Sequence, residues 1–228
     1  MNECLNEVIM YGDKDQVIKV KDLFNAVLDC GWVYDYYTEH DLQWPSFVNT
    51  RFYLDSVSDV IYSERHNEWF VKIDYTSPFS PFFSIIQNLL DTIDASNIKH
   101  VLYSIELNSE LFINTDIEDR YFLNKYYVCI DIADTNDDIV KQFLFTGFYA
   151  TDIQDLCSKF QTQCTLLLIN TEFQTIDSYE TLIKAVEYLK DIGVYINILH
   201  STSIYNPEQE LDTAKNIETI VNDITKGE

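Results

Sequence analysis

The chain has little basic charge and few residues that interrupt regular structure. Only five glycines and four prolines occur among its 228 residues, which favours a chain rich in helices and strands. No run of about 18 apolar residues occurs, so no transmembrane helix is expected. Segment 1–7 has neither the basic region nor the apolar core of a signal peptide. We therefore expect a cytoplasmic location.

Metal-binding patterns are also missing. The five cysteines are odd in number and show no CxxC spacing, so we expect neither a disulfide framework nor a zinc knuckle. No histidine pairs with another ligand at helical spacing, and HExxH is absent. Segment 134–138 starts like a calcium loop, but Ile139 replaces the expected glycine and no glutamate follows at the twelfth position. The sequence predicts no metal and no cofactor.

Enzyme signatures are absent as well. The isolated glycines form neither GxGxxG nor a phosphate-binding loop, and no GxSxG motif or cysteine beside a candidate base occurs. We therefore predict a protein that is not an enzyme. Catalytic groups can be scattered along a chain, so an enzyme with an unrecognised site stays as one alternative.

Acidic charge is the strongest compositional feature. The 38 Asp and Glu outweigh 15 Lys and Arg, giving a net charge of −23, shared almost equally by residues 1–115 and 116–228. Direct binding of nucleic acid or of an anionic membrane surface is disfavoured. Spread evenly, these charges would lie on the order of 20 Å apart, beyond the Debye length of about 8 Å. The charge can therefore recruit a partner only where it is clustered, and otherwise serves solubility alone.

Three stretches concentrate the acids. Residues 22–50 contain five acids and no Lys or Arg, and residues 100–119 contain five more without a base. Residues 126–140 add Asp131, Asp134, Asp137 and Asp138. These stretches predict local acidic surfaces rather than an even distribution.

The first half has the pattern of an α+β domain. Trp69, Val71, Ile73 and Tyr75 alternate with polar residues, as in a half-buried strand. Capping signals at Asp13 and at Ser80-Pro81 predict helix starts. Strands are expected at 8–11, 51–54, 68–75 and 101–107, with 57–62 as a further candidate, helices at 13–28 and 80–93, and an irregular aromatic segment at 30–47. The order β-α-β-β-α-β predicts a ferredoxin-like domain over residues 1–115.

The second half predicts another mixture of helices and strands. Its apolar run 165–169 is typical of a central strand buried on both faces. Asp177 with Glu180 predicts a helix start, and Gly193 its end. Other strands are expected at 126–132, 143–149 and 194–198, and other helices at 151–160 and 206–224. We therefore predict a second α/β domain over residues 116–228, with mixed sheets, helices packed on them, and the boundary within 108–120.

The most unusual local feature is segment 32–45, which interleaves aromatic residues with carboxylates. Aromatic residues are enriched in interface hot spots, and arginine can both pair with a carboxylate and stack on a ring. The alternative is an ordinary loop that packs Trp32 and Trp44 into the core. The candidate partner-binding residues are Tyr34, Asp35, Tyr36, Tyr37, Glu39 and Asp41, with Asp131, Asp134, Asp137 and Asp138 as a second set.

Segments 6–12, 30–32 and 75–81 give the first half a family resemblance. They read Asn-Glu-Val-Ile-Met-Tyr-Gly, Cys-Gly-Trp and Tyr-Thr-Ser-Pro-Phe-Ser-Pro. Residues 1–110 resemble a ferredoxin-like family of phages and plasmids, whose members mostly lack an assigned function. The resemblance implies an origin in a mobile element and carries over no functional residues.

These observations favour a binding protein over a catalyst. The leading hypothesis is a phage or mobile-element inhibitor that mimics nucleic acid and blocks the basic nucleic-acid-binding surface of a bacterial defence protein, as anti-CRISPR proteins do. An immunity protein that neutralises a basic toxin would use the same electrostatics. In either case the expected partner is a basic protein.

Overall fold

The computed structural model describes residues 3–44, 52–78, 80–95, 97–106, 110–132 and 147–203. The chain divides into two compact units, with the boundary between Tyr121 and Phe122. The first unit takes the chain again from Thr202, whose N–H donates to the carbonyl of Phe112. In the described part of the chain, no helix is long and apolar enough to span a bilayer.

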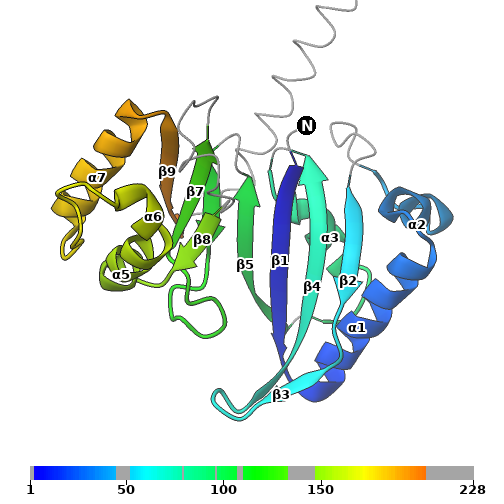
Figure 1. The fold of residues 1–228 in the computed structure, drawn as a ribbon. Coiled ribbons are helices and arrows are strands. Elements are labelled where there is room, and N and C mark those ends of the chain that lie inside the picture. Colours follow the sequence, from blue (N-terminus) through cyan, green and yellow to red (C-terminus); the bar gives the residue numbers. More distant parts are fainter. Residues whose placement is uncertain are drawn as a thin grey trace, which may run out of the picture. The chain divides into compact units, whose positions relative to one another are not determined.

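The first unit is built on an antiparallel sheet (Figure 1). The strands lie in the order β2-β4-β1-β5-β6, and β3 pairs with β4. Its elements are β1 (Glu3–Gly12), α1 (Lys14–Asp29), α2 (Val33–Glu39), β2 (Tyr53–Val57), β3 (Ile61–Ser63), β4 (Glu68–Pro78), α3 (Phe83–Leu90), β5 (Lys99–Glu106) and β6 (Leu111–Asn114). This order departs from the predicted β-α-β-β-α-β by the additional α2 and β6, whereas β3 overlaps the end of the further strand candidate at 57–62.

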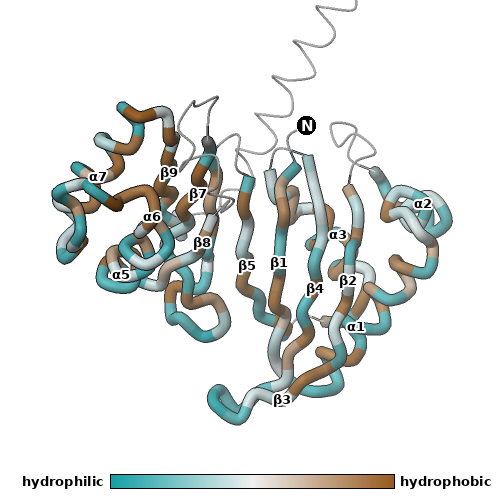
Figure 2. The backbone as a smooth tube through the Cα atoms, viewed as in Figure 1, coloured by the Kyte–Doolittle hydropathy of each residue, from teal (hydrophilic) through white to brown (hydrophobic). Residues whose placement is uncertain are grey.

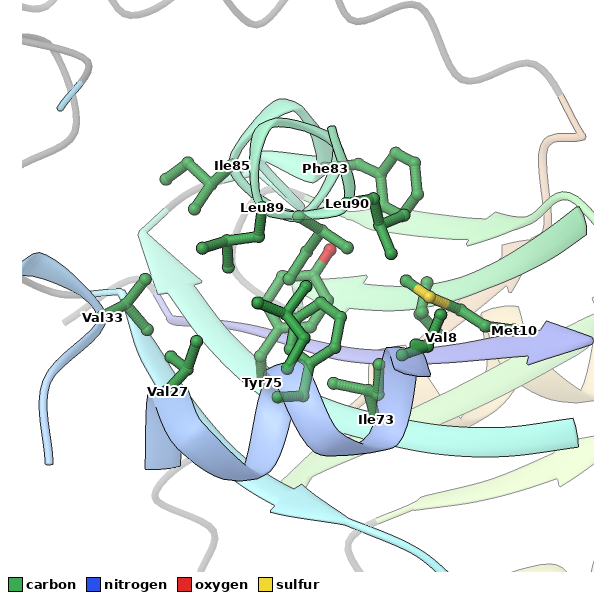
Figure 3. Close-up of a cluster of buried hydrophobic side chains, with 14 of the residues drawn as sticks. Val8, Met10, Val27, Val33, Ile73, Tyr75, Phe83, Ile85, Leu89 and Leu90 are labelled. Atoms are coloured by element: carbon green, nitrogen blue, oxygen red, sulfur yellow. The ribbon is translucent and has the colours of Figure 1, made fainter. Parts of the chain in front are cut away.

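One face of this sheet carries the core of the first unit. Val8 and Met10 of β1 lie opposite Ile73 and Val71 of β4, and all four side chains are fully buried. Helices α1 and α3 supply the apolar residues that cover them (Figure 3). Burying one such aliphatic side chain stabilises a fold by about 1.5–3 kcal/mol. Figure 2 shows hydrophilic and hydrophobic positions mixed along α1, as expected for a helix with one buried side.

The predicted alternation in β4 and the predicted helix start at Asp13 are confirmed, whereas the predicted helix start at Ser80-Pro81 is wrong. Val71, Ile73 and Tyr75 belong to the core cluster, and Trp69 packs against it. Helix α3 begins at Phe83, and its N-cap is Phe82, which takes a left-handed conformation (φ 46°). Helix α1 does begin after Asp13, but the Asp13 carboxylate makes no capping hydrogen bond.

The second unit has a smaller antiparallel sheet with helices on one face. Strands lie in the order β8-β7-β9. The buried side chains of Val128, Ile130 and Ile196 pack with apolar residues of the helices. The elements are β7 (Tyr126–Ile132), β8 (Gly147–Ala150), α5 (Ile153–Gln163), α6 (Thr165–Leu168), α7 (Tyr179–Asp191) and β9 (Val194–His200).

The predicted strand at 165–169 is wrong, and so are the predicted mixed sheets. Residues 165–168 form α6, because the N–H groups of Leu167 and Leu168 both donate to the carbonyl of Cys164. Without that central strand, the described strand pairs of this unit are antiparallel. Gly193 ends α7 with φ 90°, as predicted. The expected helix 206–224 lies outside the described residues.

Candidate partner-binding surface

The aromatic and acidic segment forms a short helix rather than the irregular loop that we predicted. Trp32 is the extended residue before α2, and its carbonyl accepts hydrogen bonds from the N–H groups of Asp35 and Tyr36. The helix stops at His40, and Asp41 then takes a left-handed conformation (φ 53°) that turns the chain. The helical repeat therefore sorts the side chains of this segment into an inner and an outer side.

The inner side of α2 belongs to the core. Tyr36 and Tyr37 are 7% and 1% exposed, and the Tyr37 hydroxyl donates to the carbonyl of Ile85 in α3 at 2.9 Å. The Tyr37 ring also meets Trp44 edge to face, 5.1 Å between centroids. Burial raises the pKa of the Tyr37 hydroxyl. We predicted both tyrosines as partner contacts. Their side chains are instead packed in the core and do not lie on the surface.

The outer side of α2 combines two exposed rings with three exposed carboxylates. Trp32 and Tyr34 are 46% and 42% exposed. Trp32 rests against Tyr53 of β2, with ring centroids 5.1 Å apart, and Tyr34 rests against the edge of Trp44. We call the following residues, all exposed, the α2 outer face: Trp32, Tyr34, Asp35, Glu39 and Asp41. Trp44 therefore packs against the core, as expected for an ordinary loop, whereas Trp32 stays exposed.

The carboxylates of the α2 outer face carry uncompensated charge. In the described ranges, no ion pair involves Asp35, Glu39 or Asp41, and the sequence has no Lys or Arg between residues 22 and 50. Other acids do have a cation partner: Lys21 lies 2.6 Å from Asp59, and Lys72 bridges Glu7 and Asp74. The acids of the α2 outer face therefore differ from Asp59, Glu7 and Asp74, whose charges are balanced by a lysine.

Cys30 adjoins the same face without being a nucleophile. Its thiol donates to the Glu39 carboxylate at 3.6 Å. Desolvation by burial, together with the negative charge of Glu39, raises the pKa of the Cys30 thiol. A thiol with a raised pKa stays protonated at neutral pH, so this cysteine is not activated for covalent chemistry.

The second predicted set is only partly described. Asp131 is exposed at the end of β7, opposite Tyr195 of β9, and belongs to the second unit. Asp134, Asp137 and Asp138 lie outside the described residues. The prediction that these four acids contact a partner therefore stays a prediction.

The second unit contains an open groove that could suggest catalysis. It has a volume of about 780 Å³ and lies between α5 and segment 174–177. Its lining includes Cys157, whose pKa is raised by burial and by the nearby Asp177. None of its lining residues is a histidine, and the one lining carboxylate, Asp177, raises the pKa of the Cys157 thiol and so keeps it protonated. The lining residues therefore do not activate this thiol.

An internal charged cluster was missed by sequence reasoning. Arg120 pairs with Glu68 at 2.8 Å and lies 5.0 Å from the centre of the Tyr11 ring, while the Tyr121 hydroxyl donates to the same carboxylate at 2.7 Å. Burial and Glu68 raise the pKa of Tyr121. These residues lie far apart in the sequence, at positions 11, 68 and 120–121, so no local motif predicts the cluster. The cluster ties segment 120–121 to β1 and β4.

Buried polar groups form a second internal network. The Asn6 amide donates to the carbonyls of Cys4 and Tyr75 and to the Ser77 hydroxyl, and Ser104 donates to the Asn6 side-chain oxygen. These bonds join β1, β4 and β5 and satisfy the buried side chain of Asn6. Within the described residues, no group of three His, Cys, Asp or Glu could hold a metal ion.

Comparison with known proteins adds no relative. No protein-family model matches the chain, and no curated protein sequence matches it. On the described surface, the α2 outer face is the part that combines exposed rings with carboxylates without a described ion pair.

Proposed function

We propose that this protein is an acidic, non-catalytic binding protein that occupies a basic nucleic-acid-binding surface of another protein. It acts as an inhibitor from a phage or other mobile element, directed at a bacterial defence protein in the manner of an anti-CRISPR. The observation that carries the proposal is the α2 outer face, where three exposed carboxylates without a described ion pair adjoin two exposed rings.

The spacing of these carboxylates supports a concentrated field. Asp35 and Glu39 are four residues apart on α2, and side chains at that spacing start about 5–6 Å apart. This is shorter than the Debye length of about 8 Å at physiological salt, so their potentials add. Nucleic acid likewise presents closely spaced negative charges, which basic channels neutralise with Lys and Arg. The outer face can thus compete with nucleic acid for such a channel.

Two finer points belong to the same proposal. The first unit is a ferredoxin-like domain with insertions: what supports this is the antiparallel order β5-β1-β4-β2, with α1 and α3 as the connecting helices. The protein acts in the cytoplasm, where nucleic-acid-dependent defence proteins meet their substrates. The ferredoxin-like family of phages and plasmids that residues 1–110 resemble agrees with a mobile-element origin.

The test is charge reversal of the three exposed acids, Asp35→Lys, Glu39→Lys and Asp41→Lys in one variant. We expect the tagged wild-type protein to capture a nucleic-acid-binding protein from host lysate, with capture weakened by salt and competed by DNA or RNA. The variant should lose this capture while its circular dichroism spectrum stays unchanged, because all three side chains are exposed.

The matched control reverses three exposed acids of the second unit, Glu172, Glu187 and Asp191. It changes the net charge equally and should keep full capture. Equal loss of capture in both variants would mean that binding depends on net charge and not on the α2 outer face. Capture of a small basic toxin instead would favour the alternative function, that of an immunity protein.

A further inference from the structure

The α2 outer face has an internal order that the net charge does not describe. Trp32, Asp35 and Glu39 stand at positions i, i+3 and i+7, which places them in one row along the helix. Tyr34 and Thr38 stand at i and i+4 in a second row, and Asp41 lies beyond the end of the helix. Only the first row therefore joins an exposed ring to carboxylates of the helix, so that one side chain of a partner can reach a ring and an acid together.

The same chain already binds one of its own arginines in this way. The Arg120 guanidinium lies over the Tyr11 ring, 5.0 Å from its centroid, while Nη2 pairs with Glu68 at 2.8 Å. Ring and carboxylate act on one planar group, which can stack with its face and donate hydrogen bonds from its edge. The α2 outer face offers this pair of acceptors, ring and carboxylate, on an exposed surface.

We propose that the α2 outer face selects arginine over lysine, so that its occupant is an arginine-rich segment of the basic partner. This inference rests on the proposed function and deepens it. A guanidinium stacks on Trp32 and donates to Asp35 or Glu39. Lysine gains the Coulomb attraction, and its ammonium can lie over a ring as Lys14 does over Trp69, but it has no planar group that stacks on a ring while its edge donates to a carboxylate.

The test compares nona-arginine with nona-lysine, two peptides of equal charge and length, by calorimetry at matched ionic strength. An exposed cation–π contact is worth about two- to fivefold in affinity, so one guanidinium stacked on Trp32 predicts a preference for arginine of up to about fivefold. Trp32→Leu with Tyr34→Leu should bring that preference close to onefold, since the joint contact with a ring and a carboxylate is lost. Trp32→Phe with the Tyr34 ring intact should keep most of it.

A control separates this preference from general attraction by the negative charge of the molecule. Neutralising Glu172, Glu187 and Asp191 with Gln, Gln and Asn should weaken both peptides alike and leave their ratio unchanged. Equal binding of the two peptides by the wild type would overturn the arginine inference and leave a basic partner intact. Binding of neither peptide at low salt would overturn the proposed function, and the arginine inference with it.

Discussion

At the scale of single residues, burial decides which groups of this protein titrate. Cys164 is fully buried between α5 and α6, and burial raises the pKa of its thiol from its usual value of 9.0 to about 12. In the unfolded chain the thiol is free to ionise at its usual value. The folded protein therefore holds a proton that the unfolded protein has lost, between about pH 9 and pH 12.

The consequence is a loss of stability at alkaline pH. Below about pH 9 the Cys164 thiol is protonated in both states, so its contribution is fully present there, and it declines as pH rises toward 12. The slope is about 1.4 kcal/mol per pH unit for one proton. Urea unfolding at successive pH values should show a shallower decline for Cys164→Ala than for the wild type. Parallel curves would mean that this thiol ionises normally in the fold.

Residue burial also explains the mixed outcome in α2. The sequence places Trp32, Tyr34, Tyr36 and Tyr37 within six positions, and composition does not separate contacts from core residues. The helical repeat does separate them, because Val33, Tyr36 and Tyr37 turn inward and leave Trp32 and Tyr34 outside. A helix of seven residues is too short to be predicted from periodicity, so this sorting required the structure.

At the scale of elements, helix starts depend on which polar side chain reaches a free N–H group. The sequence predicts Asp177 as the cap of α7, but Ser178 holds that position, and its hydroxyl accepts from the N–H of Thr181 at 3.3 Å. Asp177 instead accepts from the Thr181 hydroxyl. Neighbouring cap formers give the same sequence signal, and only the backbone geometry separates them.

The two residues should therefore differ on substitution. Ser178→Ala removes the acceptor for a backbone N–H at the start of α7 and should lower the free energy of unfolding by about 0.5–2 kcal/mol. Asp177→Ala removes only a side-chain hydrogen bond on the surface and should cost less. Chemical denaturation of both variants measures the difference. A larger loss for Asp177→Ala would show that the aspartate is the stabilising residue.

The elements that the sequence predicts well are those with strong period-two patterns. Strand β4 could be predicted because its two faces differ, and the structure shows that its apolar face packs in the core. The apolar run at 165–169 failed because a short run without alternation fits a buried strand and a buried helical turn equally. The distant cluster of Tyr11, Glu68 and Arg120 leaves no periodic signal at all.

At the scale of the whole molecule, charge opposes folding. A net charge of −23 favours expansion of the chain by self-repulsion. The described ion pairs are mostly at the surface, with Asp59 and Asp94 exposed by 91% and 87%, and such pairs contribute about 0–1 kcal/mol each. Screening should therefore relieve more repulsion than it removes attraction.

This balance predicts that salt stabilises the protein. Raising NaCl from about 10 mM to about 150 mM shortens the Debye length from about 30 Å to about 8 Å. If screening recovers about 1 kcal/mol, the melting temperature should rise by about 2–4 °C in calorimetry. The Asp35, Glu39 and Asp41 charge-reversal variant has a net charge of −23 + 6 = −17 and should rise less. A fall in melting temperature with salt would instead show that ion pairs dominate.

The sequence by itself determined the α+β class, the acidic character, the amphipathic strands and the base-free segments, because composition and short periodic patterns are local properties. Only the tertiary structure decided that both described sheets are antiparallel, that Tyr37 is in the core, and that Trp32, Tyr34 and three unpaired carboxylates share one exposed face. The physical reason is that burial and charge compensation depend on residues distant in the chain. The Tyr37 hydroxyl bonds to Ile85 of α3, and Lys21 and Lys72 pair with the acids Asp59 and Glu7 rather than with those of α2.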